Sequence, residues 1–437
     1  MAAYKAMAGT QDILPDQQPY WRMVEQTVER VMQLYGFGRI DTPTFEETAV
    51  FQRGVGAGTD IVEKEMYSFE DRGGEHLTLR PEGTAGVVRA YLEHGLFMKP
   101  QPVKLFYVRV PMFRFERQQR GRYREHHQFG CEALGETDPA VDAEIIAVLM
   151  NIYRELGLRG LELHLNSIGD RVCRPRYVQA LVEYYRPLYN DLCQDCKVRF
   201  DKNPLRLLDC KEPQDQPKVA NAPKITDYLD EACAAHFAEV RRLLDAEGIS
   251  YVLDPLLVRG LDYYSRTAFE VMPVAGASRR QSAIGGGGRY DGLAELLGGR
   301  STPGIGFGAG MERIIEVMKE QGIQPPAEPP LLAYVAYVGA EAKMEAARLV
   351  TELRQANIRA ELAFGDRSLK AQMKQANASG ARYVFVIGEE ELQRGEVAVR
   401  ADSAEGRKHF SVKRGEALAV AQGGKYQKLD RTGQDGE

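Results

Sequence analysis

The sequence predicts an α+β protein of two domains, on the strength of three observations. Leu105 to Glu132 reads as two strands joined by an arginine-rich loop, which makes a hairpin. A proline-rich run at 325–330 is typical of a semi-rigid linker. Beyond that run, strand and helix patterns alternate, as in a small α/β domain with a partly parallel sheet. We therefore expect a large domain over 1–325, a small domain over 326–425, and a disordered tail over 426–437.

Composition narrows the class of protein. A chain of 437 residues with 44% hydrophobic and 27% charged residues is ordinary for a globular protein with two to three domains. Its net charge of −5 argues against non-specific nucleic-acid binding over the whole surface, so any RNA contact must use local basic patches. The longest apolar run, near Leu331 to Val338, is too short to span a bilayer, and the first ten residues lack an apolar signal core. We expect a cytoplasmic protein without membrane contact.

The expected elements of the large domain follow from periodicity and turn residues. Apolar residues recur at helical spacing over 20–35 and 142–156, and residues 302–318 read as a glycine-rich strand that runs into a helix. Strands are expected at 39–46, where Pro43 places the strand at a sheet edge or an interface, and at 66–69, 76–80 and 161–166. The stretch 170–247 is mostly helical and charged, so we interpret it as an inserted lobe.

The small domain begins with a buried-type strand at 331–338 and a helix at 340–355. A strand at 358–364, a helix at 368–379 and a strand at 382–387 follow. Short strands are expected near Val397 and Phe410.

The hairpin at 105–132 carries the residues of a ligand site. Strand alternation places Arg114 and Glu116 on one face, and it groups Gln128, Gly130 and Glu132 on the return strand. Five arginines in the hairpin predict a polyanionic ligand, because guanidinium groups match phosphate bidentately; they are Arg114, Arg117, Arg120, Arg122 and Arg124. The alternative is a charged hairpin tip that is simply solvated. For Gln118, Gln119 and Arg120 in the loop there are likewise two interpretations. They either contact the end of an RNA or belong to a free, solvated loop.

Two segments resemble a known family. FRFE, the arginine-rich loop and GRYREHHQFGCE are similar to the second motif of class II aminoacyl-tRNA synthetases, in the form that histidyl-tRNA synthetases have. LVRGLDYY at 257–264 resembles a segment peculiar to histidyl-tRNA synthetases. The resemblance implies an antiparallel-sheet catalytic core, with a helical insertion at about 170–247 in reach of the tRNA acceptor arm, and a C-terminal anticodon-binding α/β domain. It also implies a homodimer, built on the helix and strand of 20–46.

The resemblance assigns a histidine site. Glu82 follows Pro81 at a strand exit and would hold the ammonium of the amino acid, although an acidic residue in the first turn of a helix is equally explained as a cap. Arg259 would approach the substrate carboxylate and the α-phosphate. The alternative is that Arg259 and the neighbouring tyrosines form a strand edge with surface aromatics. A phenol and a carboxylate can satisfy both imidazole nitrogens. The implied histidine-binding residues are Glu82, Gly83, Thr84, Gln128, Glu132, Arg259, Tyr263 and Tyr264.

The same resemblance assigns an ATP site. Arg114 would contact the α-phosphate, and Arg313, in the first turn of the helix after the glycine strand, the γ-phosphate. With Arg259 these are the implied catalytic residues, and Mg²⁺ would bridge the phosphates. Glu116 belongs to the same site, as does His126, which stands where the family is expected to stack a phenylalanine on adenine. The glycines of 304–310 fail the dinucleotide fingerprint, and no P-loop occurs.

The implied reaction is activation of L-histidine by ATP, followed by transfer to tRNA(His). One alternative is a catalytically silent regulatory subunit of ATP phosphoribosyltransferase with the synthetase fold, against which LVRGLDYY and the C-terminal domain argue. Another is a synthetase for proline, threonine or glycine, which should lack LVRGLDYY.

The six cysteines indicate reduced thiols. Cys193 and Cys196 form a CxxC pair that Cys210 follows, so a zinc site has to be considered. No fourth ligand stands at convincing spacing, since Asp195, Asp209 and the remote His236 are the nearest candidates. We therefore expect no metal bound by protein thiols.

Overall fold

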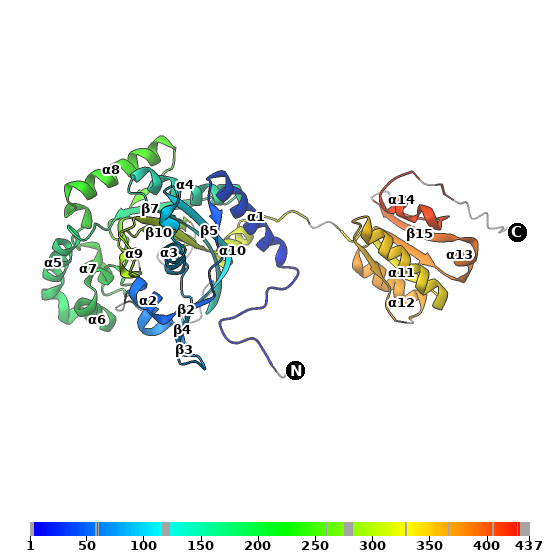
Figure 1. Cartoon of the computed structure of the whole chain (residues 1–437), viewed down its shortest axis with the longest axis horizontal. Coiled ribbons are helices and arrows are strands. Elements are labelled where there is room, and N and C mark those ends of the chain that lie inside the picture. The colour runs from blue at the N-terminus through cyan, green and yellow to red at the C-terminus, as the bar shows by residue number, and fades with distance from the viewer. Residues whose placement is uncertain are drawn as a thin grey trace. The chain divides into compact units, whose positions relative to one another are not determined.

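The structure is a computed structural model that describes residues 4–56, 59, 61–115, 123–258, 260–274, 283–327, 330–365, 367–403, 406–425 and 427–428. The chain divides into two compact units, Met1–Pro326 and Ala327–Glu437 (Figure 1). The expected tail at 426–437 lies almost wholly outside the described residues. Within those residues, no helix has both the length and the apolar composition that crossing a membrane requires.

The first unit is built on an eight-stranded sheet in the order β1-β5-β6-β11-β10-β9-β7-β8. The central pairs, from β5 to β7, are antiparallel, and the pairs at the two edges are parallel. The predicted hairpin is β5 and β6, and the glycine strands are β10 and β11. The strand bounds are β1 Gly38–Arg39, β5 Val103–Phe113, β6 Glu125–Leu134, β7 Leu161–Ser167, β8 Val252–Leu253, β9 Ser265–Pro273, β10 Gly285–Arg289 and β11 Gly304–Gly310.

Four helices bury their apolar stripes in one core against this sheet, and Figure 1 shows α1, α4 and α8 gathered along one side of it. They are α1 (Gln18–Leu34), α4 (Pro139–Glu155), α8 (Glu231–Ala246) and α10 (Met311–Glu320). Asp138 caps α4 by accepting the Ala140 N–H at 2.8 Å. Val28, Ile146, Val240 and Ile314 are fully buried in this core. The opposite face, over which α3 (Thr84–Glu93) and α9 (Leu293–Leu296) pack, is left for the site.

The strand expected at 39–46 is divided in the structure. β1 pairs in parallel with β5, whereas β2 (Phe45–Glu47) pairs with β4 (His76–Leu79) in a separate sheet with β3 (Tyr67–Glu70). Pro43 lies between the two pieces, where its missing N–H costs no ladder hydrogen bond. Helix α2 (Thr48–Val55) then packs against α3.

The helical stretch after β7 has two parts. The lobe, which we define as residues 174–230, has its own small core around Tyr177, Leu181 and Leu207. It contains α5 (Arg174–Tyr185), α6 (Gln194–Lys202), α7 (Gln216–Ala220) and short 3-10 turns at Arg186–Asp191, Pro204–Asp209 and Ile225–Asp227. Helix α8 instead packs on α4 and joins the main core.

The second unit is the predicted small α/β domain. Its five-stranded sheet has the order β13-β12-β14-β15-β16, with parallel pairing among the first three strands and antiparallel pairing beyond. Its elements are β12 Ala333–Tyr337, α11 Ala340–Gln355, β13 Ala360–Leu362, α12 Leu369–Ser379, β14 Tyr383–Ile387, α13 Glu389–Arg394, β15 Glu396–Ser403, β16 Gly406–Lys413 and α14 Ala417–Ala421.

Candidate active site

Glycines form the floor of the site on the open face of the large sheet. Opposite Gln128, Gly130 and Glu132 of β6, strand β11 places Gly310, Gly308 and Gly306. Gly308 in turn pairs with Gly286 of β10. A Cβ at Gly130 would collide with the Phe307 carbonyl, and one at Gly306 would collide with the Glu132 carboxylate. The central strands therefore offer a floor that a ligand can approach closely.

Glu132 lies at the bottom of the site with no exposed surface. One carboxylate oxygen accepts the Thr84 hydroxyl at 2.8 Å, and the other accepts the Tyr290 hydroxyl. Burial raises the pKa of Glu132 to about 8, against the lowering effect of these hydrogen bonds. Glu132 is therefore an acid that titrates near neutral pH. It is buried where it could hydrogen-bond to a titratable nitrogen of a ligand.

Glu82 stands at the N-terminus of α3. Its two oxygens accept the backbone N–H groups of Thr84 and Ala85, each at 2.8 Å. The Tyr263 hydroxyl donates to it at 3.3 Å. Burial raises the pKa of Glu82, and the backbone hydrogen bonds oppose that shift. The cap that was one interpretation of the sequence is present, and it fixes the carboxylate beside the tyrosines.

Aromatic rings wall this pocket. Tyr263 and Tyr264 are buried with ring centroids 4.8 Å apart, and Tyr263 lies 5.7 Å from Tyr290. Tyr107 of β5 is also buried, and its ring would lie 2.6 Å from a Cβ at Gly83. Burial raises the pKa of Tyr107 and Tyr290, which keeps both phenols as donors. Sequence reasoning missed these two residues, although Tyr290 lies only two residues beyond the last glycine of the run 285–288.

A second hollow, of about 230 Å³, opens beside this pocket and carries the cationic groups. Its walls include Arg114, His126, Gln128, Arg313, Glu270 and Glu312. Arg114 is held by a hydrogen bond of 2.7 Å from its Nε to the Pro81 carbonyl, and Arg313 by one of 2.6 Å from Nη1 to the Ala283 carbonyl. Each guanidinium is thereby oriented at the edge of the glycine floor, which suits a phosphate chain.

His126 is a neutral group in this hollow. Burial, together with the positive charges of Arg114 and Arg313, lowers its pKa to about 3. Its Nε2 lies 3.4 Å from the amide nitrogen of Gln128. An uncharged imidazole ring can stack on a base without adding a charge near the phosphates.

The predicted groups converge from distant parts of the chain. Arg114 bonds the carbonyl of the residue before Glu82, and Thr84 links Glu82 to Glu132 through one hydrogen bond each. Gln128 lies on the same strand as Glu132 and lines the hollow of Arg114. An arginine, two carboxylates and an amide thus surround one site.

Arg259 and Glu116 lie outside the described residues, as do Gln118, Gln119, Arg120 and the neighbouring loop arginines Arg117 and Arg122. Three groups of side chains in the described residues have the composition of cation sites, and one of them is Asp170, Cys173, Asp230 and Cys233. Glu270 and Glu312 offer carboxylates to the hollow. Cys193, Cys196, Cys210 and Asp215 gather in the lobe.

Comparison with known proteins gives the family. A family model for histidyl-tRNA synthetase matches residues 9–174 and 210–314, and one for the anticodon-binding domain matches 333–423. A histidine–tRNA ligase of Dehalococcoides mccartyi strain BAV1 is 51% identical over 397 residues, which are 91% of this chain and 94% of that protein. One from Moorella thermoacetica is 53% identical over 392 residues, 90% of this chain and 92% of that protein.

A solved structure agrees with the sequence relatives. The apo histidyl-tRNA synthetase of S. aureus matches with a TM-score of 0.79 and 38% identity, and the match covers 96% of this chain and 100% of that one. The predicted class II core with a C-terminal anticodon-binding domain is confirmed. The chain belongs to the histidyl-tRNA synthetase family.

Proposed function

We propose that the protein is a histidine–tRNA ligase. It joins L-histidine to the adenylyl group of ATP with release of pyrophosphate, and it then passes the histidyl group to the terminal ribose of tRNA(His) with release of AMP. The observation that carries the assignment is the buried Glu132, which lies among tyrosines on the same strand as Gln128. Gln128 lines the neighbouring hollow together with Arg114 and Arg313. Such a site binds an imidazole at one end and a polyphosphate at the other.

In our proposal the histidine side chain lies between Glu132 and the tyrosine wall. The carboxylate accepts from one ring nitrogen, and a phenol of Tyr263 or Tyr264 pairs with the other. An amino acid without these nitrogens would leave buried polar groups unpaired, which is the strongest form of rejection a pocket can offer. Glu82, held by Thr84 at the cap beside Gly83, receives the substrate ammonium, while Gln128 and Arg259 orient its carboxylate.

ATP lies across the glycine floor in this proposal. Arg114 binds the α-phosphate and Arg313 the γ-phosphate, with Glu116 and His126 at the nucleoside end. The histidine carboxylate oxygen attacks the α-phosphorus, the bond to the bridging oxygen breaks, and pyrophosphate leaves with that electron pair. No protein nucleophile is needed, because oriented cations stabilise the charge that builds on the phosphorus oxygens. Arg259 adds a further cation at the α-phosphate.

Mg²⁺ fits the same hollow, because carboxylates of Glu270 and Glu312 line it beside the phosphate-binding arginines. Bound there, the ion would neutralise phosphate charge. Glu312 is already ordered for this role, since the His127 backbone N–H donates to it at 3.0 Å.

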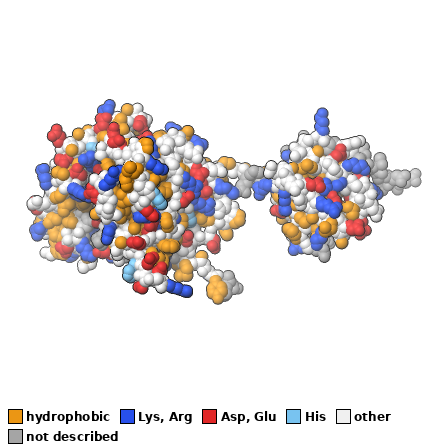
Figure 2. Space-filling model, viewed as in Figure 1, with side chains coloured by type: hydrophobic (Ala, Val, Ile, Leu, Met, Phe, Trp, Pro, Cys, Tyr) orange, Lys and Arg blue, Asp and Glu red, His pale blue; other side chains and the backbone are white. Residues whose placement is uncertain are grey.

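The second unit supplies the tRNA contact away from the reaction. In the view of Figure 2, lysine and arginine side chains are interspersed with acidic ones over each unit, so tRNA recognition rests on local groups and not on a general positive field.

We further propose a homodimer through α1 and β2, where Leu34 and Phe45 are 72% and 51% exposed. Six unpaired cysteines fit a cytoplasmic protein.

ATP–pyrophosphate exchange measured with each of the twenty amino acids tests the function. We expect exchange with histidine alone, and charging of tRNA(His) by the same preparation. Exchange with proline, threonine or glycine would favour a sister synthetase. No exchange with any amino acid would favour a regulatory subunit of ATP phosphoribosyltransferase. Light scattering tests the homodimer, for which a monomer mass is the contradicting result.

A further inference from the structure

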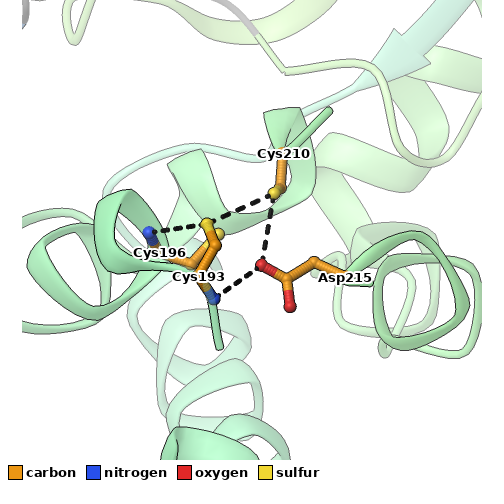
Figure 3. Close-up of side chains that lie close together, drawn as sticks. All are labelled: Cys193, Cys196, Cys210 and Asp215. Carbon is orange, nitrogen blue, oxygen red and sulfur yellow. Dashed lines mark hydrogen bonds between the residues drawn. The ribbon is translucent and has the colours of Figure 1, made fainter. Parts of the chain in front are cut away.

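Three thiols and a carboxylate come together in the lobe, from three separate segments. Cys193 and Cys196 lie at the start of α6, Cys210 follows a 3-10 turn, and Asp215 precedes α7. One ligand atom from each lies within 4.8 Å of every other (Figure 3). Cys196, Cys210 and Asp215 are 99% buried, and Cys193 is partly exposed. Sequence spacing had pointed to Asp195, Asp209 or His236, so the fourth group was missed.

Two distances between these ligand atoms match those of a tetrahedral metal site. With Zn–S of about 2.3 Å and Zn–O of about 2.0 Å, tetrahedral angles place two sulfurs about 3.8 Å apart and a sulfur about 3.5 Å from an oxygen. Cys193 Sγ and Cys210 Sγ are 3.8 Å apart, and Cys210 Sγ is 3.4 Å from Asp215 Oδ2. A disulfide, with sulfurs about 2.05 Å apart, is not the arrangement present.

Surrounding groups already orient these ligands. Asp215 Oδ1 is held by Lys218 Nζ at 3.0 Å. Its Oδ2 accepts the Cys193 backbone N–H at 3.0 Å and lies 3.4 Å from Cys210 Sγ (Figure 3). The Cys196 backbone N–H donates to Cys193 Sγ at 3.4 Å. Hydrogen bonds of this kind orient the side chains that coordinate the metal directly.

From this geometry we infer that Cys193, Cys196, Cys210 and Asp215 bind one Zn²⁺ ion that holds the lobe together. This reverses the expectation of no thiol-bound metal, which rested on a missing fourth ligand. On binding, each thiol that coordinates gives up its proton to solvent, and zinc undergoes no redox change.

The lobe has the construction of a metal-stabilised subdomain. Between Cys193 and Ala220 its helical segments have nine, six and five residues, too short to be stable alone. Its core is separate from that of the large sheet. A metal that binds all three segments would supply stability that a small core, with little buried apolar area, cannot provide.

The tied segment also touches the proposed histidine pocket. Asn203, between Cys196 and Cys210, donates from its side chain to Asp262 Oδ1 at 2.9 Å. Asp262 directly precedes Tyr263 and Tyr264, and a cavity wall contains Asn203, Arg206 and Tyr264 together. Zinc would therefore steady the segment that carries the tyrosine wall. This consequence, unlike the metal site, rests on the proposed function.

A second cluster in the same region provides the control. Asp170, Cys173, Asp230 and Cys233 also lie within 4.8 Å of one another. There both carboxylates already cap helical turns, Asp170 accepting from Val172 N–H at 2.9 Å and Asp230 from Cys233 N–H at 2.8 Å. This group has two thiols where the first cluster has three, and thiolates are the ligands that structural zinc prefers, so it is not assigned zinc.

Metal analysis by mass spectrometry of protein purified without chelator is the direct test. We expect one zinc per chain, and less than a tenth of that in Cys210→Ser. Asp215→Asn, which keeps the fold by preserving shape, should weaken zinc binding by about 10- to 100-fold. Cobalt exchanged into the wild-type site should give the visible absorption of tetrahedral cobalt–thiolate, and Cys233→Ser should leave zinc content and spectrum unchanged.

Zinc absent from the wild type and not taken up on titration would overturn the inference. So would zinc lost in Cys233→Ser but kept in Cys210→Ser, or a Cys193–Cys196 disulfide in place of the metal. For the link to the pocket, chelation should raise the KM for histidine more than that for ATP, with recovery on zinc addition. Unchanged KM values with zinc removed would refute that link and leave the metal site intact.

Discussion

Replacement of Glu132 by glutamine is the most informative single change in the pocket. The substitution keeps shape and hydrogen-bonding capacity but removes the ionisation. In the folded chain Glu132 holds its proton up to pH of about 8, whereas in the unfolded chain it loses the proton near its ordinary value of 4.5. Raising the pH through this window therefore favours the unfolded state of the wild type, and the variant lacks this contribution.

The size of the effect follows from the two pKa values. At about 1.36 kcal/mol per pKa unit, the difference between 4.5 and about 8 costs the wild type about 5 kcal/mol of unfolding free energy across the window. Because other groups titrate alike in both proteins, the stability of Glu132→Gln relative to wild type should rise by about that amount between pH 4.5 and 8. Urea denaturation across this range measures it.

The same variant tests recognition of the substrate. Above pH 8, where Glu132 is ionised, loss of a charge-assisted hydrogen bond costs about 1.5–3 kcal/mol, so the KM for histidine measured there should rise about 10- to 150-fold. The KM for ATP should stay within about threefold, since Glu132 lies outside the arginine-lined hollow. A stability difference that is flat with pH would refute the raised pKa. An unchanged histidine KM would refute the placement of the imidazole.

Three further predictions follow from contacts already described. His126→Phe should retain exchange with the pH profile of wild type between pH 5 and 9, because His126 is neutral throughout; an inactive variant would contradict its stacking role. Gly306→Ala should lower kcat/KM for histidine on the order of a hundredfold, because the new Cβ displaces the Glu132 carboxylate; wild-type kinetics would refute this. Arg289→Met should cost about 3–5 kcal/mol in urea denaturation, because the buried Asp142 loses its guanidinium partner and keeps only His236, 3.4 Å away, whose pKa burial lowers; an unchanged midpoint would be the contrary result.

Local patterns in the sequence were enough to predict the elements that carry the site. The hairpin, the glycine-rich strand β11 and the helix α10 after it depend on alternation and periodicity within short segments, and the structure confirms each. The same alternation places Gln128 and Glu132 on one face of their strand. Family resemblance then supplied what spacing alone could not, the roles of Arg114 and Arg313.

Contacts between distant segments were not predictable in this way. Tyr290 reaches Glu132 across 158 residues, and nothing within its own segment marks it as a ligand of that carboxylate. Asp215 joins the three cysteines only because two short turns fold back on α6. The strand expected at 39–46 failed for a related reason, since its halves pair with different sheets.

Central to the account is one site in which an imidazole on Glu132 and an α-phosphate on Arg114 are held together. A crystal structure of the protein with a non-hydrolysable histidyl-adenylate analogue tests this directly. We predict imidazole nitrogens within hydrogen-bond distance of Glu132 and of Tyr263 or Tyr264, with the phosphate analogue on Arg114. An imidazole bound away from Glu132, or a phosphate analogue that does not contact Arg114, would contradict it.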